Sequence, residues 1–168
     1  RLAEAKNTTP EHLTVCCLDR PRHDEIIASL RELNVNLKLI TDGDVSGIIY
    51  IIEKKSPVDM YLGIGGGPEG VLAASALDAY NCNFQGRFIF NNSDEIKRAK
   101  SMGINDLHKK YKLNDIIKGD SIFCATGVTS GDLVNGIINN ENEYISETFV
   151  THKGSNYKNI VTIKKQND

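Results

Sequence analysis

A glycine-rich turn that carries one carboxylate is the stretch of this sequence best suited to bind a small anion. The turn reads GGGPEG at residues 65–70, between an apolar run at residues 58–64 that predicts a buried strand and a helix-forming run at residues 71–80. Glycines let the backbone come close to a ligand, and Pro68 suits the first turn of a helix, whose free N–H groups attract phosphate. Glu69 stabilises such a helix start but repels a phosphate. A cation bound between the two would remove the conflict, and the alternative is that Glu69 interacts only with the helix dipole.

The same turn satisfies the pattern G-x-G-x-x-G, so a nucleotide-dependent oxidoreductase domain is one candidate function. A dinucleotide site also needs a carboxylate about 20 residues further on, at the end of the next strand. Residues 90–92 read FNN at that place, and Glu69 would lie against the pyrophosphate. Both observations argue against a dinucleotide site.

Two arginines flank a proline in the sequence DRPRH at residues 19–23. Arg20 and Arg22, on a turn stiffened by Pro21, could clamp a phosphate because guanidinium groups bind its oxygens in pairs. The alternative is two solvated arginines beside a helix start. We interpret His23 as a capping or surface histidine rather than as a catalyst.

Two aspartates bracket a glycine at Asp42, Gly43 and Asp44. Either aspartate could cap the next helix, but a helix needs only one such cap. The second carboxylate therefore suggests that the pair holds sugar hydroxyls or a metal. A fourth polar run, TGVTSGD at residues 126–132, offers hydroxyls before an expected helix, and helix capping explains most of it.

These polar clusters follow apolar runs that predict strands. The predicted strands cover residues 13–18, 37–40, 59–64 and 121–125, and the predicted helices include residues 24–33, 45–53 and 71–80. This alternation is typical of an α/β fold with a mostly parallel sheet covered by helices. The carboxyl ends of parallel strands meet at one edge of a sheet, so we expect the four clusters to converge there.

The rest of the chain completes one predicted α/β domain, residues 1–168. Residues 84–90 could add a strand before a helix at residues 94–102. Residues 146–152 and 159–164 alternate between apolar and polar side chains, which predicts a closing hairpin. No linker, repeat or low-complexity tract divides the sequence.

Composition argues against several classes of partner. The net charge of −2 gives no field that favours nucleic acid or an anionic membrane, and no apolar run approaches the length of a membrane helix. None of the four cysteines, Cys16, Cys17, Cys82 and Cys124, forms a C-x-x-C pair. We interpret them as small buried thiols in a reducing compartment, the cytoplasm.

Taken together, the motifs resemble a known family. The runs LDRPRH, LITDGDV, GIGGGPEGV, QGR and ATGVTSGDL, in that order and spacing, resemble the C-terminal half of class II fructose-1,6-bisphosphatases, which also occur as the bifunctional fructose-1,6/sedoheptulose-1,7-bisphosphatase. The resemblance runs from about residue 13 to the end of the chain. It implies an inositol-monophosphatase-like sugar phosphatase fold with a divalent metal, Mn²⁺ or Mg²⁺. It also implies hydrolysis of the 1-phosphate of fructose 1,6-bisphosphate to fructose 6-phosphate and phosphate, a step of gluconeogenesis.

The resemblance also implies roles for individual residues. Glu69 resembles a metal ligand of the family. The residues that resemble substrate contacts are Arg20, Pro21, Arg22, Asp42, Gly43, Asp44 and Gly66.

One departure from the family pattern limits what this chain can do alone. The family's N-terminal half holds most of the metal-binding carboxylates, including a D-P-[IL]-D-G-[ST] segment, and no such segment occurs here. We therefore expect the C-terminal part of a longer enzyme, with no catalytic residue assigned in this chain and no activity without the missing half. We also expect a homo-oligomer. The alternative from a different class is a non-catalytic sugar-phosphate-binding module.

Overall fold

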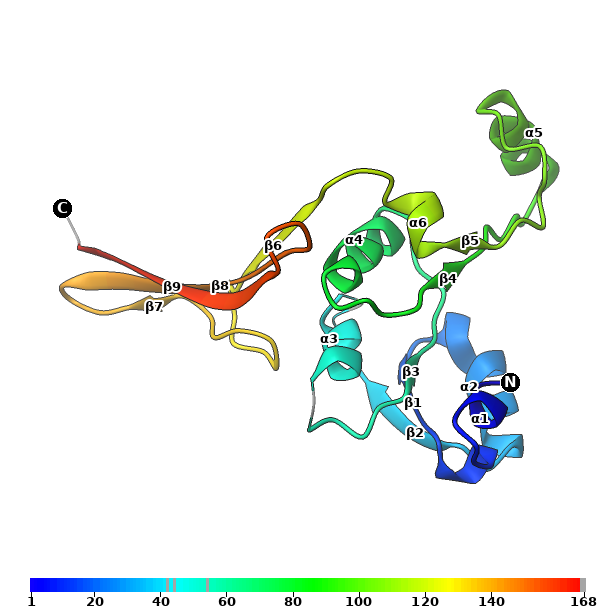
Figure 1. Ribbon diagram of the computed structural model, residues 1–168, viewed down its shortest axis with the longest axis horizontal. Helices are drawn as coiled ribbons and strands as arrows, with labels where there is room; N and C mark the ends of the chain where they lie inside the picture. Colours follow the sequence, from blue (N-terminus) through cyan, green and yellow to red (C-terminus); the bar gives the residue numbers. More distant parts are fainter. Residues whose placement is uncertain (42, 44, 54, 167–168) are drawn as a thin grey trace.

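A three-stranded parallel sheet organises the first part of the molecule (Figure 1). The computed structural model describes residues 1–41, 43, 45–53 and 55–166. The strands are β1 (Thr14–Leu18), β2 (Asn36–Ile40) and β3 (Met60–Tyr61), in the order β2-β1-β3. Val15 of β1 pairs with Leu37 on one side and with Met60 on the other. Because β1 is central and covered on both faces, its last four side chains are buried.

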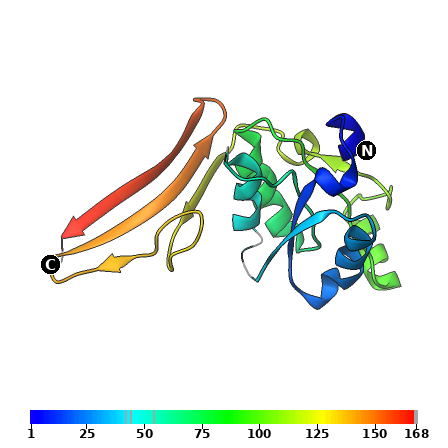
Figure 2. The same cartoon turned by 90° about the horizontal axis from the view of Figure 1, so that it is seen from below.

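Helices on opposite faces connect these strands. α2 (Asp24–Glu32) joins β1 to β2 and buries Ile27 and Leu30, which belong to the apolar stripe of its sequence. α3 (Ser46–Ile52) joins β2 to β3 on the other face (Figures 1 and 2). α3 comes so close to β3 that a Cβ atom at Gly47 would lie 2.6 Å from the Tyr61 ring. A sheet whose helices change face in this way is doubly wound, and its crevice lies between β1 and β3.

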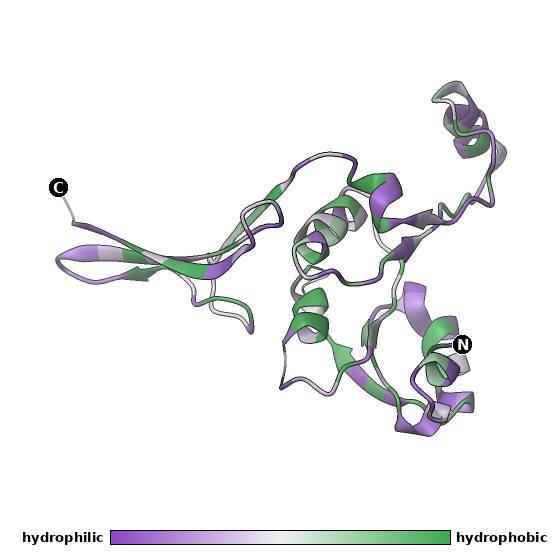
Figure 3. Ribbon diagram, in the orientation of Figure 1, coloured by the Kyte–Doolittle hydropathy of each residue, from purple (hydrophilic) through white to green (hydrophobic). Residues whose placement is uncertain are grey.

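A second, antiparallel sheet packs on the far side of the helices. Its strands are β6 (Ile122–Thr126), β7 (Ile138–Asn139), β8 (Glu143–His152) and β9 (Tyr157–Gln166). In both views α3 and α4 (Gly67–Asp78) lie between this sheet and the parallel one. Ala76 of α4 packs there against Phe123 and Phe149. Because both sides of the helical layer are covered, α3 and much of α4 are hydrophobic in Figure 3.

The remaining elements lie at the periphery. The chain begins with α1 (Leu2–Ala5) and the 3₁₀ turn η1 (Pro10–His12), and a second 3₁₀ turn, η2 (Pro21–His23), precedes α2. After α4, the short strands β4 (Gln85–Gly86) and β5 (Tyr111–Lys112) pair antiparallel, and α5 (Ser93–Ser101) lies between them in sequence. α6 (Leu113–Ile116) leads to the second sheet. Figure 1 shows that α5 stands away from the rest of the molecule.

The structure confirms an α/β fold with a parallel sheet but corrects its extent. The strands predicted at residues 13–18 and 37–40 form the parallel sheet, and the one predicted at residues 59–64 joins it over Met60–Tyr61 only. The predicted hairpin is present as β8 and β9. The strand predicted at residues 121–125 is wrongly placed, because β6 pairs antiparallel with β8 in a separate sheet. Phe123 is buried and its neighbour Ile122 is 66% exposed, the alternation of a strand covered on one face only.

Two further expectations about secondary structure are wrong. The predicted strand at residues 84–90 shortens to β4. No helix follows residues 126–132, where the chain folds back on itself instead. The Ile137 N–H donates to the Val128 carbonyl (3.2 Å), and a Cβ atom at Gly136 would lie 2.6 Å from the Ser130 nitrogen. Such close backbone contact is open only to glycine, so the sequence favours a compact loop over a helix.

Candidate functional site

A hollow of about 400 Å³ opens at the crevice between β1 and β3. Its lining comes from the segment that follows β1, through Arg22, and from the segment that follows β3, through Ile64, Gly65, Gly66 and Glu69. In a doubly wound sheet the loops that leave adjacent strands separate at this point and leave room for a ligand. The hollow therefore lies where the topology alone predicts a binding site.

Arg22 and His23 both bind the backbone of Ile64. The Arg22 Nε donates to the Ile64 carbonyl oxygen (2.6 Å), and the Ile64 N–H donates to the His23 Nε2 (2.8 Å). The other ring nitrogen of His23, Nδ1, lies 2.8 Å from the Leu18 carbonyl oxygen at the end of β1. His23 is 0% exposed, so our interpretation of it as a surface histidine is wrong. It occupies the N-cap position of α2, but its side chain makes no capping hydrogen bond. Its ring satisfies backbone groups that the diverging strands leave unpaired.

The glycine turn presents bare backbone to the hollow. Gly66 is the N-cap of α4, and its backbone is extended (φ −70°, ψ 157°), a conformation open to any residue. Neither Gly65 nor Gly67 has a positive φ, and a Cβ atom at either position would meet nothing within 4 Å. Backbone strain and crowding therefore do not explain these glycines, whereas the close approach of a ligand would.

Glu69 lies in the first turn of α4 and is exposed. Its carboxylate folds back toward the start of the helix, because a Cβ atom added at Gly66 would overlap Oε2. The carboxylate thus stands beside the helix N-terminus and within the same hollow as Arg22. An oxygen donor at this place fits a hard divalent cation. Within the described ranges, however, no group of three or more His, Cys, Asp or Glu side chains could hold a metal ion. Any cation here would need further ligands.

Comparison with known proteins identifies the family. Residues 1–165 match the sequence model of a protein family described as bacterial fructose-1,6-bisphosphatase, glpX-encoded. The chain belongs to this family.

Curated relatives are similar to the chain over part of their length. A class 2 fructose-1,6-bisphosphatase of Escherichia coli is 36% identical, with 89% of this chain and 48% of the relative aligned. One from Haemophilus influenzae is 35% identical, over 89% of this chain and 49% of the relative. A D-fructose 1,6-bisphosphatase class 2/sedoheptulose 1,7-bisphosphatase of Trichodesmium erythraeum is 34% identical, over 81% of this chain and 43% of the relative. The chain therefore spans about half the length of the curated relatives it matches.

The structure brings together only some of the residues that the fructose-bisphosphatase motifs single out. Arg20 and Pro21 are exposed in the turn that also carries Arg22. Gly43 has a φ of 89° and accepts a hydrogen bond from the Gly47 N–H (2.8 Å) at the start of α3. Asp42 and Asp44 lie outside the described residues.

The expected convergence of four polar clusters is wrong for the run at residues 126–132. That run leaves β6 in the antiparallel sheet rather than the edge of the parallel sheet. There it binds a helix of the layer between the sheets, because Asp132 accepts a hydrogen bond from the Tyr50 hydroxyl of α3. The hollow is therefore built from the clusters that follow β1 and β3.

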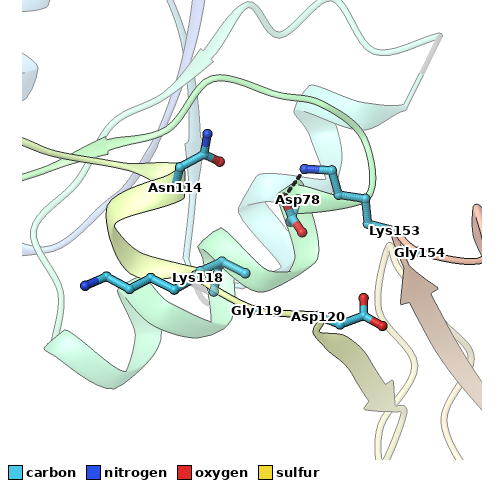
Figure 4. A pocket seen from close by; sticks show the side chains of 8 residues that line it. Asp78, Asn114, Lys118, Gly119, Asp120, Lys153 and Gly154 are labelled. Atoms are coloured by element: carbon cyan, nitrogen blue, oxygen red, sulfur yellow. Dashed lines mark hydrogen bonds and ion pairs between the residues drawn. The ribbon is translucent and has the colours of Figure 1, made fainter.

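A second hollow, of about 670 Å³, was not predicted. It lies where the end of α4, the segment between α6 and β6, and the β8–β9 turn meet (Figure 4). Lys153 pairs there with the buried Asp78, and the His152 Nε2 lies 2.7 Å from the Asp120 carboxylate. The one signal in the sequence that could have indicated this hollow is Asp78, an aspartate within the apolar run 71–80. The pairs join elements that are distant in sequence, and we assign them a structural role.

The prediction that all four cysteines are buried is only partly right. Cys16 and Cys17 are buried in β1, and desolvation raises the pKa of the Cys16 thiol to about 11. The pKa of Cys17 is also raised by burial, as is that of the half-buried Cys82. Cys124 is exposed, because it lies on the uncovered face of β6. None of the described helices combines the length and the apolar character needed to cross a membrane.

Proposed function

We propose that this chain forms the phosphate-binding part of a metal-dependent sugar bisphosphatase. The enzyme would hydrolyse the 1-phosphate of fructose 1,6-bisphosphate to fructose 6-phosphate and phosphate, as in gluconeogenesis, in the cytoplasm. One observation carries the proposal. A guanidinium, a bare glycine backbone at a helix N-terminus and a carboxylate line the same hollow at the β1/β3 crevice. Membership of the fructose-bisphosphatase family and the names of the relatives support the choice of substrate.

Each residue of the hollow has a role that follows from its chemistry. Arg22 binds a phosphate of the substrate, and the N–H groups at the start of α4 point their partial positive charge at the same anion. Glu69 holds a divalent cation, Mn²⁺ or Mg²⁺, through an oxygen ligand of the kind these ions prefer. The bound cation supplies charge neutralisation for the phosphate and an activated water. The sugar contacts Arg20, Pro21, Asp42, Gly43, Asp44 and Gly66.

The longer enzyme supplies what this chain lacks. Two-metal phosphate hydrolysis needs several carboxylates around one water, and the described residues offer Glu69 without two further ligand side chains nearby. We propose that the remaining ligands and the catalytic residues come from a half of the enzyme that lies outside this chain. In this proposal the complete protein has an inositol-monophosphatase-like fold and forms a homo-oligomer. The name of one relative, a D-fructose 1,6-bisphosphatase class 2/sedoheptulose 1,7-bisphosphatase, makes sedoheptulose 1,7-bisphosphate the second substrate to test.

A non-catalytic sugar-phosphate-binding module is the second candidate. The lack of three clustered metal ligands among the described residues favours it for the chain taken alone. The two candidates differ in their dependence on metal. A binding module would hold fructose 1,6-bisphosphate without Mn²⁺ and release no phosphate, whereas the enzyme would need the ion for turnover.

The test is phosphate release from fructose 1,6-bisphosphate by the longer protein that contains this chain, with and without Mn²⁺. Glu69→Gln keeps the size of the side chain but removes its charge. Loss of a metal ligand removes several kcal/mol of transition-state stabilisation, so kcat should fall by roughly 10²-fold or more and Mn²⁺ activation should weaken. The control is Glu95→Gln, because Glu95 also lies in the first turn of a helix, α5, but far from the hollow. Normal kcat and unchanged Mn²⁺ activation in Glu69→Gln would reduce Glu69 to a helix-dipole partner.

A further inference from the structure

We propose that His23 is a positioning residue that holds the Ile64 peptide, and through it the glycine turn and Arg22, in the geometry needed to bind the phosphate. This inference rests on the proposed function of the hollow. His23 itself does not line the hollow. It stands directly behind the residues that do, and it is fully buried.

The partners of the ring determine which nitrogen carries its proton. A carbonyl oxygen can only accept, so the Nδ1 that lies 2.8 Å from the Leu18 oxygen must donate. A backbone N–H can only donate, so Nε2, which lies 2.8 Å from the Ile64 nitrogen, is placed to accept from it. The same Nε2 lies 3.0 Å from the Ile64 carbonyl oxygen, which already accepts from the Arg22 Nε. A ring with its proton on Nδ1 makes the bonds to the Leu18 carbonyl oxygen and to the Ile64 N–H together. The ring is thus a fixed bridge between the end of β1 and the segment after β3.

This bridge continues the strand pairing to the point where the site begins. The Leu62 N–H still donates to the Cys16 carbonyl oxygen (3.0 Å), in line with the β1–β3 ladder. Two residues later the ring of His23 takes over this role at Ile64. The ring also packs on the backbone in between, because a Cβ atom at Gly63 would lie 3.4 Å from Nε2.

Ile64 is the last anchored residue before the glycine turn. Its N–H is held by His23 and its carbonyl oxygen by the Arg22 Nε, 2.6 Å away. The next residue, Gly65, has no side chain and nothing within 4 Å of where one would stand. Gly66 caps α4 and Gly67 begins it, so the position of Gly65 depends on Ile64 on one side and on the helix start on the other. The same carbonyl orients the guanidinium of Arg22, so one ring controls both sides of the hollow.

Two substitutions separate a positioning role from a merely structural one. His23→Gln places an amide oxygen near the position of Nε2 and can still accept from the Ile64 N–H, but it loses the bond to Leu18. His23→Asn places an amide nitrogen near the position of Nδ1 and can still donate to the Leu18 carbonyl, but it loses the hydrogen bond from the Ile64 N–H. Each variant removes one buried hydrogen bond, so both should lower the melting temperature by a similar amount. His108→Asn, on an exposed loop, is the control.

The first readout is amide hydrogen exchange at residues 64–67 of the longer protein. The second is the KM and kcat of the longer protein for fructose 1,6-bisphosphate, measured with Mn²⁺. We expect exchange at these amides to accelerate at least tenfold in His23→Asn and to stay within about threefold of the unsubstituted protein in His23→Gln. We expect the KM to rise about tenfold or more in His23→Asn, with a smaller change in kcat, and to change little in His23→Gln.

The outcomes distinguish this inference from the proposed function. Equal exchange rates in the two variants, or KM values that follow the melting temperature alone, would overturn the positioning role. If the unsubstituted protein neither binds nor hydrolyses fructose 1,6-bisphosphate, the proposed substrate is wrong. Hydrogen exchange at Ile64 then still decides whether His23 fixes the turn.

Discussion

Lys153 and Asp78 form an ion pair, with 2.8 Å between Nζ and Oδ1, that joins the β8–β9 turn to the end of α4 (Figure 4). The two side chains differ in exposure, since that of Asp78 is 6% exposed and that of Lys153 is 49% exposed. The carboxylate therefore depends on the lysine for the solvation that it loses on folding. This pair thus adds a charged contact to the apolar packing that joins the antiparallel sheet to the helical layer.

Replacing Lys153 should destabilise the fold. Lys153→Met keeps the length of the side chain but leaves the buried Asp78 carboxylate without its cation, so the free energy of unfolding should fall by about 2 kcal/mol. The measurement is urea unfolding. Lys164→Met is the control, because its 3.7 Å pair with Glu143 lies on the surface and should contribute less than about 0.5 kcal/mol. Equal effects of the two substitutions would mean that Asp78 is adequately solvated without Lys153.

Arg22→Ala in the longer enzyme should weaken substrate binding. The loss of a charged hydrogen bond costs on the order of 1.5–3 kcal/mol, so the KM for fructose 1,6-bisphosphate should rise about 10-fold to 150-fold. Arg98→Ala, on the outlying helix α5, should leave the KM unchanged. If KM and kcat are both normal in Arg22→Ala, Arg22 serves only to bind the Ile64 carbonyl.

Substitutions at two glycines at the start of α4 should affect different properties, Gly66→Ala the response to Mn²⁺ and Gly70→Ala the stability of the helix. Ala at Gly66 is compatible with the backbone there, but its methyl group would overlap the Glu69 carboxylate and displace it. Gly66→Ala in the longer enzyme should therefore raise the Mn²⁺ concentration needed for half-maximal activity. Gly70→Ala meets nothing within 4 Å inside α4 and should stabilise the helix by about 0.5–1 kcal/mol. Normal Mn²⁺ activation in Gly66→Ala would show that the carboxylate can move without cost.

The 168-residue chain purified alone should release no phosphate from fructose 1,6-bisphosphate above background, even with Mn²⁺. The reason is that its described residues offer no cluster of three metal-binding side chains. The Glu69→Gln chain, purified in the same way, measures contaminating phosphatase. Turnover that this substitution abolishes would place a complete active site within the chain.

The thiols should differ in reactivity, and Cys16 should make stability depend on pH. At pH 8 iodoacetamide should label the exposed Cys124 in the folded chain, and Cys16 only after unfolding.

Burial raises the pKa of Cys16 from an ordinary 9.0 to about 11, so between these values the unfolded thiol loses a proton that the folded one keeps. The contribution of Cys16 to the free energy of unfolding is thus complete below pH 9 and is lost as the pH rises toward 11. Unfolding in urea at pH 8 and pH 10, with Cys16→Ala as the reference, measures this loss.

The sequence predicts most of the parallel sheet because its signals are local. The apolar stripe of α2 and the continuous apolar run of β1 each reveal burial without knowledge of the partner. The run SIFCAT at residues 121–126 looks the same, yet only one of its faces is covered. Ile122 and Cys124 are as apolar as the buried Phe123, so composition does not reveal which sheet the strand joins.

The candidate site divides in the same way. Gly66 and Glu69 are three residues apart, and their relation follows from the rules for a helix start. His23 meets Ile64 across 41 residues of sequence, so a lone histidine beside two arginines gave no sign of its burial. The ion pair of Asp78 with Lys153 spans 75 residues, so the sequence shows an aspartate within an apolar run but not its partner.

The long outer strand β9 affects how this chain behaves in concentrated solution. Among the described residues, β9 pairs with β8 alone, and its Ile160 and Ile163 are 44% and 55% exposed. An open strand edge with apolar side chains is a template for pairing with another molecule. Three lysines on the strand, Lys158, Lys164 and Lys165, oppose this by mutual repulsion between molecules. Salt screens that repulsion, so the chain should stay monodisperse in dilute buffer and begin to self-associate as the ionic strength rises.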